Sequence, residues 1–175
     1  MPSRQQFSSM WARILEEFSD SPAQTQVVRY LLENGFGVNT AGRVICNDVE
    51  IPATHLAKVI GIDRRVVDAT AKHILNLPHI AEIFLNLRVT PDLSRLAEHL
   101  GLSMIVLYPK DATEGGIVGS AVRVLTDHDV TIRQIFVTDP VLSEDPRLVI
   151  ITEGPIPAVV YEEMRGLPQT RRLII

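Results

Sequence analysis

Residues 103–175 alternate short apolar runs with amphipathic segments, and this order constrains the fold more strongly than any other feature of the chain. The apolar runs lie at about 104–108, 130–137, 148–151 and 172–175, and the amphipathic segments at about 117–128 and 157–165. Short apolar runs between turn residues are typical of strands, whereas apolar residues three and four apart are typical of helices. The order therefore predicts one compact βαββαβ unit over residues 103–175.

Residues 1–101 carry a different pattern, in which most apolar residues recur at helical spacing. Ser21 and Pro22 are a good N-cap and first helical residue, and Gly35 is a natural helix end. Together these signals predict helices over about 4–18, 22–34, 52–60, 63–75, 76–87 and 90–101. The fold class is therefore α+β, with a helical domain at 1–101 and the βαββαβ domain at 103–175.

Residues 36–51 interrupt the helical pattern with short β-branched runs and two turn signals, at 39–42 and 47–48. Such runs between turn residues predict the strands of a small hairpin. This hairpin is either a wing of a DNA-binding domain or a structural element that covers helix ends, and the sequence favours neither.

The segment 52–76 resembles a helix-turn-helix unit. Such a unit needs a small residue where its helices touch, a glycine in the turn and apolar residues that fix the interhelical angle. Ala57 supplies the small residue, Gly61 the turn, and Ile62 and Val67 the apolar contacts. A plain pair of antiparallel helices has the same spacing, so DNA recognition and simple helix packing both remain open.

On the DNA-binding interpretation, polar residues of both helices would meet the double helix. Arg64 and Arg65 lie at the first turn of the second helix, where side chains reach base edges or phosphates. The complete set of expected contact residues is Thr54, Lys58, Arg64, Arg65, Asp68 and Lys72. The alternative is a solvated helix face with Arg–Asp pairs. The net charge of −4 argues against strong non-specific DNA binding.

Composition limits the class of protein further. A single cysteine, Cys46, excludes an intrachain disulfide framework and favours a cytoplasmic protein. No apolar stretch is long enough for a membrane span, so we expect no membrane partner. The five histidines show no metal-ligand spacing, and no phosphate-loop, dinucleotide-binding or nucleophile motif is present. We therefore expect a protein that is not an enzyme and that needs no metal or cofactor.

The unit at 103–175 resembles the ACT domain. The residues that carry the resemblance are the strand at 104–108, the loop from Asp111 through Gly115 and Gly116 into a helix, the segment 129–135, and the strand and helix at 148–151 and 157–165. This resemblance implies a ferredoxin-like βαββαβ fold that binds an amino acid and regulates a metabolic enzyme or a transcription factor.

The resemblance also implies where the ligand binds, namely in the loop between the first strand and the first helix, at a dimer interface. Carried over, the site comprises Asp111, Gly115, Gly116, Ile117 and Val118. Glycines let a ligand approach the backbone, and the N–H groups of a helix start hold a carboxylate. The chain has three residues between Asp111 and Gly115 where the family usually has two. The alternative role of the glycine pair is tight strand-to-helix packing.

The whole chain is similar to archaeal proteins described as predicted regulators of amino-acid metabolism, mainly through the segment 63–67 and the order of its parts. This similarity implies an effector-responsive regulator in which an amino acid, bound to the ACT-like domain, modulates DNA binding by the helical domain. A homodimer is expected, because pairing of two copies would cover exposed sheet edges. The alternative is a regulatory module that binds no DNA, senses a metabolite and modulates a partner enzyme.

Overall fold

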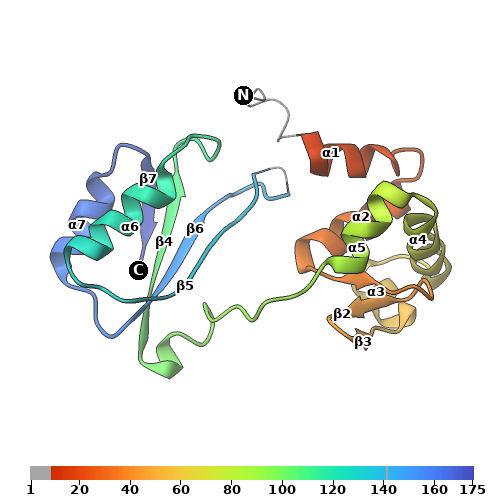
Figure 1. Ribbon diagram of the computed structural model, residues 1–175, viewed down its shortest axis with the longest axis horizontal. Coiled ribbons are helices and arrows are strands. Elements are labelled where there is room, and N and C mark those ends of the chain that lie inside the picture. The colour runs from red at the N-terminus through yellow and green to blue at the C-terminus, as the bar shows by residue number, and fades with distance from the viewer. Residues whose placement is uncertain (1–8, 141) are drawn as a thin grey trace. The chain divides into compact units, whose positions relative to one another are not determined.

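The computed structural model describes residues 9–140 and 142–175, and it confirms the α+β class (Figure 1). Residues 4–8 of the first expected helix lie outside the described residues. The chain divides into two compact units at the bond between Thr90 and Pro91. We call the part before this bond the helical unit and the part after it the sheet unit.

The helical unit consists of five helices and three very short strands among its described residues. The elements are α1 (Ser9–Glu16), α2 (Pro22–Asn34), β1 (Gly37–Val38), β2 (Val44–Cys46), β3 (Val49–Glu50), α3 (Ala53–Ile60), α4 (Arg64–Asn76) and α5 (Pro78–Asn86). Side chains from most of these elements form its core, including Phe18, Val28, Leu31, Val67, Ile74, Ile80 and Phe84, all at most 1% exposed. Full burial of such a side chain contributes about 1.5–3 kcal/mol, so the core is the main source of stability.

The helix boundaries follow the local signals in the sequence. The Ser21 hydroxyl accepts a hydrogen bond from the Gln24 amide at the start of α2, and Pro22 is the first helical residue. At the other end, Gly35 adopts a left-handed conformation with φ 68°. The predicted cap, first residue and end of α2 are thus confirmed. Ser21 and Gly35 satisfy backbone groups that the helix leaves unpaired, whereas Pro22 lacks an N–H group where the helix offers it no acceptor.

The short strands pair as an antiparallel sheet in the order β1-β2-β3. The predicted hairpin is therefore present, with a third strand, β1, added to it. Gly37 packs so closely on α5 that a Cβ atom there would lie 2.6 Å from the Phe84 carbonyl oxygen. The sheet is thus joined to the helical core through β1, whereas Val49 of β3 is 69% exposed.

The end of the helical unit is also fixed by a side chain of the hairpin. The Asn47 carboxamide accepts from the Val89 amide at 2.9 Å and donates to the Val89 carbonyl at 3.4 Å. Asn47 itself has a positive φ of 55°, a conformation that asparagine tolerates better than most residues. The predicted turn at 47–48 therefore also holds the last residues before the unit boundary.

The described residues of the sheet unit, 91–140 and 142–175, form four strands and two α-helices in the order βαββαβ. They are β4 (Leu102–Pro109), α6 (Ile117–Asp127), β5 (Ile132–Val137), β6 (Leu148–Glu153), α7 (Ala158–Gly166) and β7 (Thr170–Ile174). The strands form one antiparallel sheet in the order β5-β6-β4-β7. Each helix therefore crosses over one intervening strand, and both helices lie on the same face of the sheet (Figure 1).

The two faces of this sheet bury different side chains, because successive residues of a strand point in opposite directions. Ile105 and Leu107 of β4 pack under α6 and α7. Val106 and Tyr108 of the same strand point to the other face, where they contact a smaller cluster that includes Ala97 and Leu93. The second face is therefore covered by the segment that precedes β4.

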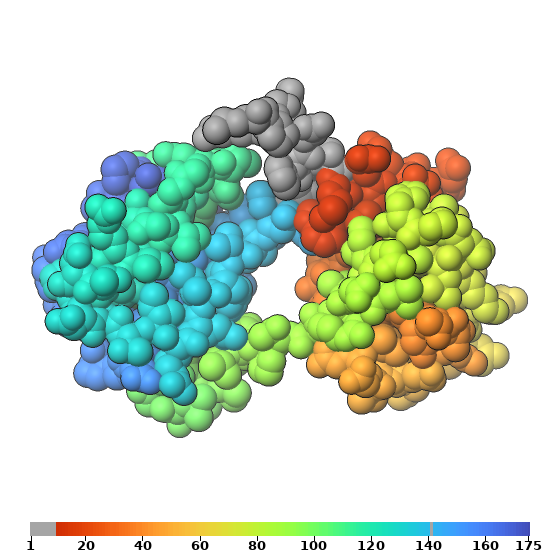
Figure 2. All heavy atoms as spheres, viewed as in Figure 1, coloured from red at the N-terminus to blue at the C-terminus, as the bar shows by residue number. Residues whose placement is uncertain are grey.

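That segment differs from the prediction. A helix over 90–101 was expected, but the structure has turns followed by the 3₁₀ helix η2 (Glu98–Leu100). The Gln134 carboxamide of β5 donates to the Pro91 carbonyl at 2.7 Å and accepts from the Leu93 amide at 3.0 Å. Residues 91–101 therefore pack on the sheet unit (Figure 2), although the sequence pattern had placed them in the helical domain.

Candidate functional site

The loop between β4 and α6 is the expected ligand site, and its first part is closed by its own hydrogen bonds. The Asp111 carboxylate accepts from the backbone amide of Thr113 at 2.8 Å and from its hydroxyl at 2.6 Å. Lys110 is held at the same place by the carbonyl of Pro168, at 2.7 Å from its Nζ. Asp111 therefore shapes the turn, as aspartate side chains commonly do.

The second part of the loop leaves the start of α6 open. Gly116 precedes the helix with φ 93°, and among the described residues no side chain makes a capping hydrogen bond there. Within the described part of the chain, a methyl group at Gly116 would have no atom within 4 Å apart from those of the adjoining residues. Because the first amides of a helix carry partial positive charge and lack intrahelical acceptors, an open start of this kind favours a carboxylate or phosphate.

A cavity of about 160 Å³ adjoins this helix start. One wall comes from the loop and α6, and the other from the end of β5 and the start of β6. The lining residues are Pro109, Ala112, Glu114, Gly116, Ile117, Val118, Gly119, Val137, Thr138, Pro146, Arg147 and Leu148. Both an acidic side chain, Glu114, and a basic one, Arg147, reach the cavity. We call this cavity the loop pocket.

The loop pocket contains part of the predicted site. Gly116, Ile117 and Val118 line it, whereas Asp111 and Gly115 do not. The sequence pattern missed Glu114 and the whole second wall. Arg147 could have been found only from strand pairing: Leu148 pairs with Leu107, so the start of β6 lies beside the end of β4.

The second candidate site is the pair α3 and α4. The amides of Gly61 and Ile62 both bond the Ala57 carbonyl at 2.9 Å, and Gly61 turns the chain with φ 82°. Ala57 and Val67 are buried, as predicted for residues between two touching helices. Among residues 9–140 and 142–175, only the residues adjoining Gly61 come within 4 Å of a Cβ built there, so this glycine is needed for its conformation and not for close packing.

Asp63 completes the first turn of α4 and also binds Arg65. The carboxylate accepts from the Arg65 amide at 2.8 Å and from the guanidinium at 3.1 Å through each of two nitrogens. These hydrogen bonds, the side-chain ones first, lower the pKa of Asp63 from 3.8 to about 2. The charge of Arg65 is therefore matched by a neighbour on its own helix start.

The expected DNA contacts divide into two groups. Thr54 and Lys58 on α3 and Arg64, Arg65 and Lys72 on α4 are exposed. Asp68 was expected on the exposed side of α4, but the structure does not place it there. It is half-buried and lines a cavity between α4 and the hairpin. The turn before β2 also reaches α4, since a methyl at Gly42 would lie 3.3 Å from Lys72 Cγ.

Neither a metal cluster nor a membrane-spanning helix is found in the described part of the chain. It brings no three His, Cys, Asp or Glu side chains together as a potential metal site. Among residues 9–140 and 142–175, no helix combines the length and the apolar character needed to cross a membrane.

Comparison with known proteins adds little to this geometry. No family model matches the chain, and no curated protein matches it either. Among solved structures, the crystal structure of PH0061 is similar at a TM-score of 0.30 with 11% sequence identity, over 88% of each chain. A similarity at that level supports no inference about fold or function, so a function can be inferred only from the residues of the chain itself.

Proposed function

We propose that the protein is an effector-responsive regulator of amino-acid metabolism. An amino acid binds in the loop pocket of the sheet unit and modulates DNA binding by the helical unit. The observation that carries the proposal is the open start of α6, which shares one pocket with Arg147 and Glu114. The protein acts in the cytoplasm and has no catalytic role of its own.

The assignment of the sheet unit to the ACT-like, ferredoxin-like class is supported by its topology. Two βαβ crossovers are interleaved, with β6 between β4 and β5, and β4 between β6 and β7. Both crossover helices pack on one face, as the ferredoxin-like arrangement requires. The loop that the family uses for its ligand corresponds here to the connection from β4 to α6.

The charges around the loop pocket suit an α-amino acid. Its carboxylate would bind the amides at the start of α6 and the Arg147 guanidinium, and its ammonium would approach Glu114. The cavity volume of about 160 Å³ limits the ligand to a compact molecule. Ile117, Val118 and Val137 offer apolar surface for its side chain.

The DNA-binding part of the proposal is supported by the α3–α4 pair. Arg64 is exposed at the first turn of α4, and Lys58 and Thr54 are exposed one turn apart on α3. A cation at a helix N-terminus is unfavourable for the helix, so a functional role would explain the two arginines there. Phosphate contacts by such residues would give affinity, and a dimer would present two α4 helices to a palindromic site.

Two observations favour the second candidate function, a regulatory module that binds no DNA. The Arg65 guanidinium already has an acidic partner in Asp63, and the chain has a net charge of −4. In this case the helical unit would contact a partner enzyme in place of DNA.

A homodimer is part of the proposal. β5 and β7 are the edges of the sheet, and the exposed apolar side chains Val137, Ile174 and Ile175 lie on or beside them. Pairing at an edge would satisfy its backbone groups and cover these side chains. Sedimentation that shows only the monomer mass, with and without effector, would contradict this part.

A thermal-unfolding screen against the standard amino acids tests whether the protein binds an amino-acid effector. A ligand at about a hundred times its Kd stabilises the folded state by about 2.7 kcal/mol, which gives a clear rise in Tm. If no amino acid raises Tm at saturating concentration, the sensor proposal is wrong.

Selection of DNA from a random pool, with and without the effector found in that screen, tests the proposed DNA binding by the helical unit. Recovered DNA should bind Arg64→Ala more weakly than wild type, whereas the matched surface change Arg29→Ala on α2 should have no effect. Coupling of about 1–3 kcal/mol between effector and DNA would change DNA affinity by roughly 5- to 150-fold. Recovery of no DNA would favour the partner-enzyme function.

A further inference from the structure

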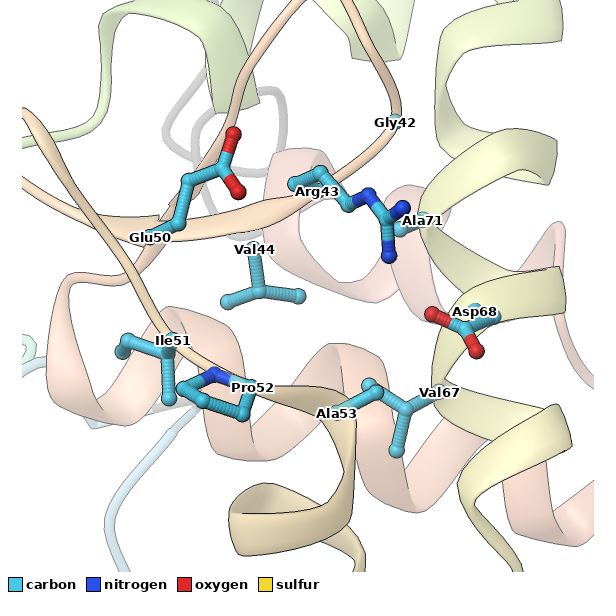
Figure 3. Close-up of a pocket in the computed structure, with 10 residues that line it drawn as sticks. All are labelled: Gly42, Arg43, Val44, Glu50, Ile51, Pro52, Ala53, Val67, Asp68 and Ala71. Carbon is cyan, nitrogen blue, oxygen red and sulfur yellow. The ribbon is translucent and has the colours of Figure 1, made fainter.

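A second cavity opens on the surface of the helical unit, between the hairpin, the start of α3 and one side of α4 (Figure 3). Its volume is about 310 Å³, which is within the range of small-molecule sites. The lining residues are Gly42, Arg43, Val44, Glu50, Ile51, Pro52, Ala53, Val67, Asp68 and Ala71. We call it the hairpin cavity, and the proposed regulator makes no use of it.

Two opposite charges face each other in the hairpin cavity without pairing. Arg43 extends from the turn after Gly42 toward α4, with its guanidinium on the side of Asp68 (Figure 3). Among the described residues, neither the Arg43 guanidinium nor the Asp68 carboxylate has a hydrogen-bond or ion-pair partner. A half-buried carboxylate usually gains such a partner, so a ligand group is a natural candidate for it.

The third charged residue of the hairpin cavity is already engaged. The Glu50 carboxylate accepts a hydrogen bond from the Asn39 carboxamide at 2.9 Å, on the opposite side of the cavity from Asp68 (Figure 3). The wall between these two sides is apolar and includes Val44, Pro52 and Val67. Within the described part of the chain, the cavity therefore offers one free cation, one free carboxylate and an apolar surface between the hairpin and α4.

We propose that the hairpin cavity binds a small zwitterion, an α-amino acid or a similar aminocarboxylate. The ligand carboxylate pairs with the Arg43 guanidinium, and the ligand ammonium pairs with Asp68. A simple anion would satisfy Arg43 but would face the carboxylates of Asp68 and Glu50. A simple cation would satisfy Asp68 but would meet Arg43, so only a dipolar ligand matches both charges.

This site is independent of the loop pocket, because it lies in the other unit and shares no residue with it. A ligand there would contact both the hairpin and α4 and would thereby hold them together, beside the exposed cations of that helix. Its existence does not depend on whether the sheet unit senses an amino acid or the helical unit reads DNA.

The test is amide-resolved NMR on the ¹⁵N-labelled full chain. The probes are the standard amino acids with β-alanine and 4-aminobutyrate, and the single-charge controls are acetate and methylamine. We expect saturable shifts at the amides of Val44, Asp68 and Ala71 with at least one zwitterion and none with either control. If no zwitterion shifts these amides, or if acetate or methylamine shifts them equally, the proposal is wrong.

Two variants then locate the charges. Arg43→Gln and Asp68→Asn should each weaken zwitterion binding at these amides roughly tenfold or more, since each removes a charge-assisted hydrogen bond. Arg29→Gln on α2 is the matched control and should bind as wild type does. Unchanged affinity in either cavity variant would overturn the proposal.

One alternative is that Arg43 and Asp68 pair directly in solution and exclude a ligand. Single and double variants distinguish this case, because a direct pair gives non-additive effects on thermal unfolding. Additive effects together with zwitterion binding support the proposed site, whereas coupling without zwitterion binding overturns it.

Discussion

Helices α4 and α6 each begin directly after a glycine-containing turn, but the two helix starts are completed differently. At α4 the Asp63 carboxylate accepts the Arg65 amide and guanidinium, so the start is satisfied from within the chain. At α6 Gly116 brings no side chain, and the start adjoins the loop pocket. A helix start with its own carboxylate is therefore structural, whereas an open start is available to a carboxylate from outside.

Two glycines, Gly37 and Gly116, differ in a similar way. Gly37 in the helical unit is needed for close contact, because a Cβ there would lie 2.6 Å from one backbone oxygen and 3.0 Å from another. Gly116 in the sheet unit has open space around it and is needed only for its φ of 93°. The contrast holds for these two positions, because Gly61 in the helical unit is also needed for its φ and not for close packing.

The largest effect is expected for Gly37→Ala. The new methyl would overlap the carbonyl oxygens of Phe84 and Leu87, which belong to rigid backbone, so the free energy of unfolding should fall by about 3 kcal/mol. Gly166→Ala is the matched control. Gly166 is the last residue of α7, and among the described residues no atom outside its chain neighbours and the backbone of α7 lies within 4 Å of a Cβ built there, so the change should be neutral or slightly stabilising. Denaturant unfolding measures both; equal stability of the two variants would disprove the close packing of β1 on α5.

The second-largest effect is expected on the affinity of the loop pocket for its amino-acid effector. Arg147→Gln should weaken binding of the amino-acid effector by roughly 10- to 100-fold, the worth of a hydrogen bond between charged groups. Arg123→Gln on α6 removes the same charge from the surface and should leave the Kd unchanged. Calorimetric titration gives both values, and equal affinities would remove Arg147 from the site.

A smaller effect is expected for Gly116→Ala. An alanine at this φ costs about 1–2 kcal/mol of backbone strain, without any steric contact. The Tm should therefore fall less than in Gly37→Ala, since the two glycines serve different purposes. A loss of stability as large as that of Gly37→Ala would mean that the loop is more tightly packed than the structure shows.

The smallest effect is expected for Asp63→Asn, and it should appear only in acid. Because the folded-state pKa of Asp63 is about 2 and its ordinary value is 3.8, its contribution is fully present above about pH 4 and is lost as the pH falls toward 2. Asparagine keeps the cap but does not titrate, so the variant should lose less stability over this range than wild type. Thermal unfolding at a series of pH values measures the difference, and salt should reduce it. Parallel curves for the two proteins would contradict the pKa shift.

Local signals were sufficient for most of the fold. Ser21, Gly35, Gly61 and Asp63 act within one helical turn of their own position, so the sequence predicts the ends of α2, α3 and α4 directly. The strands of the sheet unit were equally clear, because each is a short apolar run between turn residues. The pattern of elements could be predicted wherever the deciding contacts are close in sequence.

The failures have a different cause. The segment 91–101 has apolar residues at helical spacing, but the Gln134 carboxamide holds Pro91 and Leu93 across more than forty positions in the chain. Arg147 enters the loop pocket for the same reason, through the pairing of β6 with β4. Asp68 faces a cavity because the hairpin packs beside α4. Such positions depend on long-range packing, which overrides local propensity.

The anchoring of residues 89 and 91 has a mechanical consequence. Asn47 holds both backbone groups of Val89, and Gln134 holds the carbonyl of Pro91, so Thr90 is the one residue between two fixed points. The proline ring sets its own φ, and it also disfavours the helical region for Thr90. The conformational freedom of the backbone at this boundary is thus confined to the few torsion angles of Thr90 and its neighbours.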